Sequence, residues 1–276
     1  MIKLIAFDMD GTVLDDHKKI LPETKEALEK AAADGIEIIP ATGRPFLGLS
    51  GEIDRIAGVK YVLTTNGAGV YEKKTGKCLH EESMALDVFL PMLERLEELD
   101  VMADAFVLGQ AYTNQDKTHL IAKMHVSDAV KNYIRESRII VPRQSEFLRE
   151  KGADVEKLTV NFWNHPDGSR HQYERAWEIV REYPQFHAVS GGMQNIEITK
   201  KNVSKASGLR WLGEYLHISL EEMIVFGDSG NDLEMIKAAG TGVAMANAEK
   251  EVLEAADYVT GSNNENGMVS ALQKFL

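Results

Sequence analysis

The chain contains 276 residues, of which 44% are hydrophobic and 27% are charged. These values are ordinary for a folded globular protein, and they exclude a disordered or fibrous chain. Lys and Arg total 31 against 43 Asp and Glu, so the formal net charge is −12. That charge argues against nonspecific binding to nucleic acid or anionic lipid, and an anionic substrate would need a local cationic pocket.

Hydropathy and cysteine content do not indicate a membrane or secreted protein. The longest apolar runs, such as Leu4 to Phe7, are far shorter than the roughly twenty residues that cross a bilayer. The N-terminus lacks a basic region followed by a long apolar stretch, so we expect a cytoplasmic protein without membrane association. Cys78 is the only cysteine, and we assign it no role.

Short apolar segments alternate with a helical pattern near the N-terminus. Residues 3–7 predict a buried strand that ends in the polar loop Asp-Met-Asp-Gly-Thr. Residues 22–34 are expected to be helical, since Pro22 suits an early helical position and a glycine follows the segment. Further strands are predicted at 36–40 and 61–65, and each leads into a polar turn that contains glycine. Strands that alternate with helices predict a parallel sheet with right-handed crossovers.

A second domain is predicted inside the first. A hairpin is expected around residues 70–80, where two strand-like segments flank a polar turn. The chain then becomes richer in long amphipathic segments, and the earlier alternation of strands and helices returns near residue 195. We therefore predict a first domain over 1–81 and 187–276, and an inserted α/β domain over 82–186.

Two carboxylates follow the first predicted strand. Asp8 and Asp10 are two residues apart, so both would face the same side of an extended backbone, and Gly11 permits a tight turn after them. A carboxylate can attack phosphorus to form an aspartyl phosphate, while a neighbouring acid protonates the leaving oxygen. A strand-terminal turn stabilised by Asp side chains is the alternative explanation.

A second acidic loop, Gly-Asp-Ser-Gly-Asn-Asp at 227–232, follows another apolar strand. Mg²⁺ prefers a few carboxylate oxygens together with water and substrate phosphate. Because the carboxyl ends of parallel strands lie at one edge of a sheet, the two acidic loops could converge there. Helix capping by Asp or Asn is the alternative, and the two roles are compatible.

Two further segments suggest phosphate binding. Thr42 and Gly43 follow the second predicted strand, where a hydroxyl and backbone N–H groups could bind phosphate oxygens. Lys205 could neutralise charge on a phosphoryl group. A capping threonine and a solvated lysine are the corresponding alternatives, so neither residue identifies a site by itself.

Together, the four motifs in this order resemble those of the haloacid dehalogenase superfamily. Its members carry D-x-D-G-T, a Thr, a Lys and G-D-x-x-x-D, and the corresponding residues here are Asp8 and Asp10, Thr42, Lys205, and Asp228 with Asp232. The resemblance covers about residues 1–80 and 190–276. The segments at 41–44, 65–68 and 227–232 are similar to the Cof-type branch, which carries a large α/β cap of the C2B type. The resemblance implies a doubly wound, Rossmann-like parallel core with an inserted α/β cap domain that selects the substrate.

The resemblance also implies residue roles. Asp8 would be the nucleophile and a metal ligand, while Asp10 would be the general acid and base and would offer its backbone carbonyl to Mg²⁺. Asp228 would be another ligand, and Asp232 would support the metal directly or through water. The phosphate would be held by Thr42, Gly43, Lys205, Asn231 and the backbone of Met9.

One motif departs from the usual pattern of the branch. Where Gly-Val-Ser-Lys-Gly is usual, this chain has Asn202 and Ala206 at the two glycine positions. Asn tolerates a left-handed backbone and Ala is small, so we expect a slight adjustment and retained activity.

The implied roles predict a magnesium-dependent phosphatase that acts on small phosphorylated metabolites, such as sugar phosphates or phosphorylated cofactors. A sugar phosphomutase with the same nucleophile is the main alternative. A catalytically silent binding protein is a further alternative, but it predicts a missing nucleophile, acid or ligand, and none is missing. Arg44 is a candidate substrate contact, with an ion pair as an equally good explanation. The substrate, and the choice between monomer and homodimer, stay open.

Overall fold

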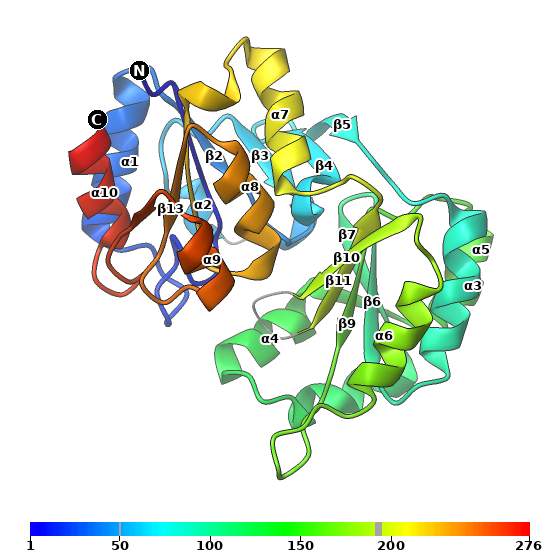
Figure 1. The fold of residues 1–276 in the computed structure, drawn as a ribbon. Coiled ribbons are helices and arrows are strands. Elements are labelled where there is room, and N and C mark those ends of the chain that lie inside the picture. Colours follow the sequence, from blue (N-terminus) through cyan, green and yellow to red (C-terminus); the bar gives the residue numbers. More distant parts are fainter. Residues whose placement is uncertain (50, 191–194) are drawn as a thin grey trace. The chain divides into compact units, whose positions relative to one another are not determined.

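The computed structural model describes residues 1–49, 51–190 and 195–276. The chain divides into two compact units (Figure 1). The core unit comprises Met1–Glu81 and Val203–Leu276, and the inserted unit comprises Glu82–Asn202. Both ends of the chain therefore belong to the core unit.

The core unit is built on a five-stranded parallel sheet. Its strand order is β14-β13-β12-β1-β2, and every neighbouring pair in it is parallel. The strands are β1 (Leu4–Phe7), β2 (Glu37–Pro40), β12 (Met223–Gly227), β13 (Thr241–Ala244) and β14 (Tyr258–Val259). Because β1 pairs with both β2 and β12, segments from the two ends of the chain lie side by side at the centre of the sheet.

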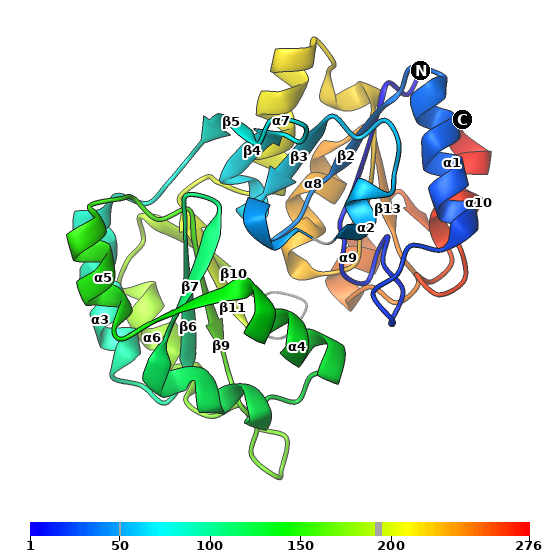
Figure 2. The same ribbon diagram turned by 180° about the vertical axis from the view of Figure 1, so that it is seen from behind.

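Helices cover both faces of this sheet. Ile5 and Phe7 join a buried cluster with residues of α1 (Pro22–Ala33) and α10 (Gly267–Phe275). Leu4 and Ala6 point to the opposite face, as alternation along a strand requires, and join a cluster with residues of three other helices. These helices are α7 (Lys205–Leu216), α8 (Leu233–Ala238) and α9 (Lys250–Ala255). Figures 1 and 2 show the two groups of helices on either side of the strands, so the sheet is doubly wound, as predicted.

A small antiparallel sheet follows β2 in the chain. It contains β3 (Tyr61–Thr64), β4 (Gly69–Glu72) and β5 (Lys77–Glu81). The predicted hairpin is confirmed as β4 and β5. β3 pairs with β4, and among the described residues it meets the end of the parallel sheet through a bridge between Ala41 and Leu63 and a hydrogen bond from the Thr42 N–H to the Leu63 carbonyl. The short helices of the core unit are η1 (Phe46–Gly48), α2 (Gly51–Asp54), η2 (Thr65–Gly67), η4 (Leu220–Glu222) and η5 (Gly230–Asp232).

The inserted unit has a six-stranded sheet with the order β10-β11-β9-β6-β7-β8. Its neighbouring strands are antiparallel except for the parallel pair β7 and β8. The strands are β6 (Met102–Val107), β7 (Gln110–Asn114), β8 (Arg138–Val141), β9 (Lys157–Asn161), β10 (Phe186–Ser190) and β11 (Ile196–Lys200).

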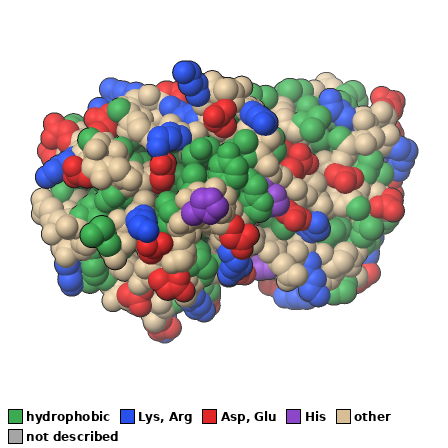
Figure 3. Space-filling view, turned by 90° about the horizontal axis from the view of Figure 1, so that it is seen from above, with side chains coloured by type: hydrophobic (Ala, Val, Ile, Leu, Met, Phe, Trp, Pro, Cys, Tyr) green, Lys and Arg blue, Asp and Glu red, His purple; other side chains and the backbone are tan. Residues whose placement is uncertain are grey.

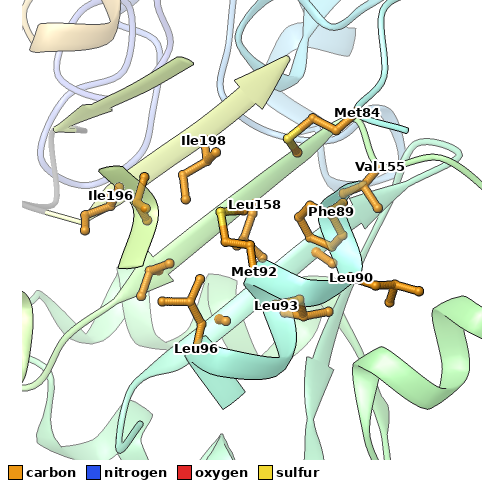
Figure 4. Packing of buried hydrophobic residues seen from close by; sticks show 14 of the residues in the cluster. Met84, Phe89, Leu90, Met92, Leu93, Leu96, Val155, Leu158, Ile196 and Ile198 are labelled. Carbon is orange, nitrogen blue, oxygen red and sulfur yellow. The ribbon is translucent and has the colours of Figure 1, made fainter. Parts of the chain in front are cut away.

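One face of the six-stranded sheet is apolar and carries three helices. These are α3 (Leu86–Glu97), α5 (Gln144–Lys151) and α6 (Tyr173–Arg181). Figure 4 shows Phe89 and Met92 of α3 packed near Leu158 and Ile198 of the sheet. The remaining helical segments, η3 (Gln115–Lys123) and α4 (Asp128–Ser137), contribute to a separate buried cluster with Met102.

Alternate side chains of the same strands make a polar face. Arg138 Nε donates to Asp104 Oδ2 at 3.1 Å, and Lys157 Nζ donates to Glu197 Oε1 at 2.7 Å. Thr159 lies opposite Asp104 on β6 and Glu197 on β11. The Thr159 side chain is buried, and its hydroxyl has no hydrogen-bond partner among the described residues. Because buried polar groups are rarely left unpaired, this face is a candidate binding surface.

The chain returns to the core unit later than predicted. We predicted the return at residue 187, but β10 and β11 pair within the six-stranded sheet, and the core unit resumes at Val203. The prediction was wrong there because strands of both units show similar local patterns, and the pairing partner alone assigns a strand to a sheet.

The longest helices of the described residues have 12 residues, and the drawn surface carries charges of both signs (Figure 3). Among the described residues, we find no helix with both the length and the apolar character needed to span a membrane. On the face drawn in Figure 3, Lys and Arg side chains are interspersed with Asp and Glu.

The packing of α1 against the parallel sheet yields a stability prediction. Leu28 is 0% exposed, and Leu28→Ala should lower the free energy of unfolding by about 2–5 kcal/mol through lost burial and a residual cavity. Leu47 is 67% exposed, and Leu47→Ala should change this free energy by less than about 0.5 kcal/mol. Equilibrium urea denaturation measures both, and equal losses would contradict the assigned packing.

Candidate active site

Loops at the carboxyl ends of the central parallel strands come together in the core unit. Asp8 directly follows β1, Asp228 directly follows β12, and Thr42 lies two residues beyond β2. The side chain of Lys205, at the start of α7, reaches the same place. The parallel pairing of β2, β1 and β12 puts these strand ends at one edge of the sheet, as expected.

Three carboxylates form a compact acidic cluster. Asp8, Asp228 and Asp232 each offer an oxygen atom, and these atoms lie within 4.8 Å of one another. The Thr12 hydroxyl donates to Asp228 Oδ1 at 2.7 Å. Asp232 Oδ2 accepts the backbone N–H groups of Asp228 and Ser229 at 3.0 and 3.1 Å. The cluster is therefore held by the backbone of its own loop as well as by side chains.

Lys205 provides a buried positive charge between two of these carboxylates. Its side chain is fully buried, and Nζ donates to Asp8 Oδ1 at 2.5 Å and to Asp232 Oδ1 at 2.7 Å. Ser204 caps α7 by accepting the N–H of Ser207, which fixes the helix start and the direction of the lysine. Burial disfavours the ammonium, but Asp232 and Asp8 outweigh it and raise the pKa of Lys205.

One lysine does not balance the negative charge of three clustered carboxylates, of which Asp8 and Asp232 are buried and Asp228 is half-buried. Burial raises the pKa of Asp8 to about 7, against the opposing effect of Lys205 and with a further upward effect from Asp232. Burial also raises the pKa of Asp228 to about 8, with Asp8 and Asp232 adding to the shift. Clustered carboxylate oxygens with uncompensated charge suit a hard divalent cation, so the three side chains fit a metal ion.

Two glycines let the loops approach so closely. Gly11 has φ +88°, and a Cβ there would lie 2.4 Å from Asp228 Oδ2. Gly67 has φ +94°, and a Cβ there would lie 2.1 Å from the carbonyl oxygen of Ser204. Any larger residue would therefore both strain the backbone and displace the neighbouring loop.

Asp10 is not one of the three clustered carboxylates, and it forms ion pairs of its own. Arg44 donates from Nε to Oδ2 at 2.9 Å and from Nη2 to Oδ1 at 2.7 Å, and Lys18 Nζ donates to Oδ1 at 2.9 Å. Burial opposes ionisation, but the two cations outweigh it and hold the pKa of Asp10 at about 2. Of the two explanations for Arg44, the ion pair is therefore present.

The residues expected to hold phosphate lie in linked loops. Thr42 Oγ1 accepts the N–H of Arg44 at 3.1 Å, and the Thr42 carbonyl accepts the N–H of Asn66. Asn231 Nδ2 donates to Asn66 Oδ1 at 3.3 Å. These contacts join the loops after β2, β3 and β12. Of the other two expected residues, Gly43 follows Thr42 directly, and Met9 is a buried residue next to Asp8.

Sequence reasoning assigned no role to three residues of this site. Thr12 belongs to the Asp-Met-Asp-Gly-Thr motif and Asn66 to the Thr-Asn-Gly-Ala motif, so their motifs could have identified them. Lys18 belongs to neither motif, and no local pattern distinguishes it from Lys19 beside it. Only the folded loop brings Lys18 to Asp10.

This fold and this cluster define the class of enzyme. Residues 5–272 match the family model of haloacid dehalogenase-like hydrolases. The chain belongs to that family and is an enzyme with phosphatase relatives.

Individual relatives span the whole chain. The Bacillus subtilis protein named "Putative phosphatase YxeH" is 34% identical, over 100% of this chain and 99% of its own length. Among solved structures, a haloacid dehalogenase-like hydrolase from B. subtilis has a TM-score of 0.86 and 27% identity, covering 100% of both chains. The subclass IIB sugar phosphatase BT4131 has a TM-score of 0.82 and 26% identity, covering 99% of this chain and 98% of its own.

The raised carboxylate pKa values predict how stability depends on pH without metal. In the folded protein Asp8 and Asp228 bind protons more tightly than in the unfolded chain, because their pKa values lie above the ordinary value of 3.8. The two protonated carboxyl groups therefore contribute fully to the free energy of unfolding below about pH 4. This contribution is lost as pH rises through about 7 to 8. Asp10 has a lowered pKa and acts oppositely, losing its contribution as pH falls from about 4 to about 2.

Thermal unfolding in chelator should therefore show a falling Tm between about pH 5 and pH 8. Asp228→Asn should reduce that slope, because the amide cannot ionise and its oxygen can still accept from Thr12. Added Mg²⁺ should raise the Tm most at high pH, where the carboxylates are ionised. An unchanged slope in Asp228→Asn would contradict the assignment.

Proposed function

We propose that this protein is a Mg²⁺-dependent phosphatase that hydrolyses small phosphorylated metabolites through an aspartyl phosphate on Asp8. The main support is the placement of Asp8 at a strand end, bonded to buried Lys205 and within reach of Asp228 and Asp232. The groups proposed as nucleophile, phosphoryl-binding cation and metal ligands thus lie together at one edge of the parallel sheet of the core unit. Family membership independently favours this chemistry.

In the first step, a carboxylate oxygen of Asp8 attacks phosphorus, and the bond from phosphorus to the leaving oxygen breaks. Asp10 gives its proton to that oxygen. Arg44 and Lys18 keep Asp10 ionised in the free protein. The negative charge of a bound phosphate opposes that ionisation, so substrate binding favours the protonated form.

In the second step, a water molecule attacks phosphorus and displaces Asp8, while Asp10 takes a proton from that water. Lys205 stays bonded to the nucleophile and stabilises negative charge on the phosphoryl group. Thr42 and the loop of Asn231 orient the phosphate oxygens. Mg²⁺ held by Asp8, Asp228 and Asp232, with the Asp10 carbonyl, would add charge neutralisation at the phosphate.

We propose that the inserted unit selects the substrate. Its polar sheet face offers hydroxyl, amide and charged groups, which suits the hydroxyl-rich leaving group of a sugar phosphate. The similarity to a sugar phosphatase over nearly the whole chain supports the same substrate class.

The proposal is tested by phosphate release from a panel of sugar phosphates and phosphorylated cofactors. Asp8→Asn should lower kcat by at least about 10³-fold, because the amide is a poor nucleophile. Chelator should abolish release, and Mg²⁺ should restore it. Asp16→Asn, in the same loop but at an exposed position, is the matched control and should retain activity.

Product analysis by ³¹P NMR separates the alternatives. Free phosphate supports the phosphatase, whereas an isomeric ester without phosphate release would establish a mutase. A wild-type protein that converts none of the compounds, with Mg²⁺ present, would favour a silent binding protein.

The role of the inserted unit predicts a second effect. Thr159→Val removes a buried hydroxyl without a partner among the described residues, so stability should stay equal or rise. The kcat/KM for the best sugar phosphate should fall about 5- to 30-fold, a loss of about 1–2 kcal/mol, if that hydroxyl binds the leaving group. Hydrolysis of p-nitrophenyl phosphate should not change. Thr118→Val is the control, at a half-buried position where the hydroxyl donates to the Gln115 carbonyl at 2.9 Å. Equal effects of both variants on kcat/KM for the sugar phosphate would reject the assignment.

A further inference from the structure

The loop between β1 and α1 adds a third donor to the Asp10 carboxylate. Arg44, whose side chain is 10% exposed, bonds to both oxygens of Asp10. Lys18 Nζ donates to Asp10 Oδ1 at 2.9 Å, and the same oxygen also accepts a hydrogen bond from Arg44 Nη2. A carboxylate has about four acceptor positions. Donors among the described residues use two positions on Oδ1 and one on Oδ2, which leaves the fourth position on Oδ2.

The backbone that carries Lys18 is held in an uncommon conformation. Lys18 has φ +61°, in the left-handed region that non-glycine residues seldom adopt. Asp15 stabilises the turn: its Oδ1 accepts the N–H groups of His17 and Lys19 at 2.9 and 2.8 Å, and its carbonyl accepts the N–H of Lys18 at 2.9 Å. Such local strain persists where surrounding contacts maintain it, and it often accompanies a functional constraint.

The turn is also tied to the rest of the core unit. Leu14 makes backbone bridges to Asp10 and to Ile20, so the turn that carries Lys18 is joined directly to the backbone of Asp10. Asn263 Nδ2 donates to the Leu14 carbonyl at 2.9 Å, and Asn264 Oδ1 accepts the N–H of Asp16 at 3.1 Å. Lys18 is therefore directed at Asp10 by a preorganised loop.

We propose that Lys18 is a positioning residue for the hydrolysis reaction and acts through Asp10. With Arg44, it fixes the plane of the carboxylate so that Oδ2 exchanges the proton with the leaving oxygen and with water. The inference depends on the proposed function, since it assumes that Asp10 is the acid and base. Lys18 itself transfers no proton: in each step the proton moves only between Asp10 and the reacting oxygen.

If Lys18 positions Asp10, its contribution to the rate of hydrolysis depends on the leaving group of the substrate. An alkoxide needs a well-placed proton to leave, so an alkyl phosphate is sensitive to the direction of the Asp10 carboxylate. A nitrophenolate is stable without that proton, so p-nitrophenyl phosphate is insensitive to it. A residue that only maintained the fold, or only attracted the phosphate, would affect both substrates equally.

The test compares Lys18→Met with Lys18→Arg in the full chain. Both variants keep a side chain of similar length on the same strained backbone, but only Arg keeps a cation and a donor. Lys19→Met is the control, because Lys19 belongs to the same turn and pairs instead with Glu52. Equal urea midpoints for the two Lys18 variants verify that the comparison concerns activity.

The measurement is kcat/KM for aryl and alkyl phosphates that carry no charge apart from the phosphate, over a range of leaving-group pKa. We expect Lys18→Met to lose about tenfold or more on alkyl phosphates and less than about twofold on p-nitrophenyl phosphate. Lys18→Arg should recover most of the loss, and Lys19→Met should match the wild type. The logarithmic plot of rate against leaving-group pKa should therefore be steeper for Lys18→Met.

Three results would overturn the inference. A loss that is equal for all leaving groups would assign Lys18 to phosphate attraction or to structure. The loss of kcat/KM could instead depend on whether the leaving group carries a carboxylate, and not on its pKa. That result would make Lys18 a substrate contact. Wild-type kcat/KM values in Lys18→Met for all of these substrates would show that Lys18 has no positioning role. An inactive wild-type protein would overturn the proposed function as well, whereas these three results leave phosphate release by the wild type intact.

Discussion

The bonds from buried Lys205 to Asp8 and Asp232 are the interactions on which the site depends. A buried charge is costly unless it is paired, so the ammonium requires its carboxylate partners and they require it. Asp228 adds a third carboxylate to the cluster without adding a cation. The remaining imbalance raises the pKa of Asp8 and Asp228, and it provides the reason for a divalent ion at this position.

The fold satisfies this constraint by bringing distant segments to one sheet edge. β1 pairs with β12 although they lie near opposite ends of the chain, and α7 delivers Lys205 from the face opposite to α1. The loops then meet at distances that only glycine allows, as at Gly11 against Asp228 and at Gly67 against Ser204. Replacing either glycine would disturb the charge arrangement through the backbone, without removing a functional group.

Local charge reconciles an acidic protein with an anionic substrate. The chain carries a net charge of −12, but exposed charges are screened beyond about 8 Å at physiological ionic strength. Lys205, Arg44 and Lys18 are instead concentrated at Asp8 and Asp10. Screening is weakest at Lys205 and Asp8, which are buried. The Asp10 environment differs from that of Asp8 for this reason: two cations lower one pKa, while burial among carboxylates raises the other.

The amino-acid sequence alone determined the parallel sheet, the family and the cluster of Asp8, Lys205, Asp228 and Asp232. Those features come from short motifs at strand ends and, for Lys205, at the start of a helix. It did not determine that β10 and β11 belong to the inserted unit, that β3 leaves the parallel sheet, or that Lys18 and Arg44 share Asp10. Strand pairing and long side-chain contacts join residues whose local patterns are unremarkable, as the comparison of Lys18 with Lys19 illustrates. Local patterns specify where a strand ends and which side chains follow it, whereas the packed tertiary structure decides which partners those side chains meet.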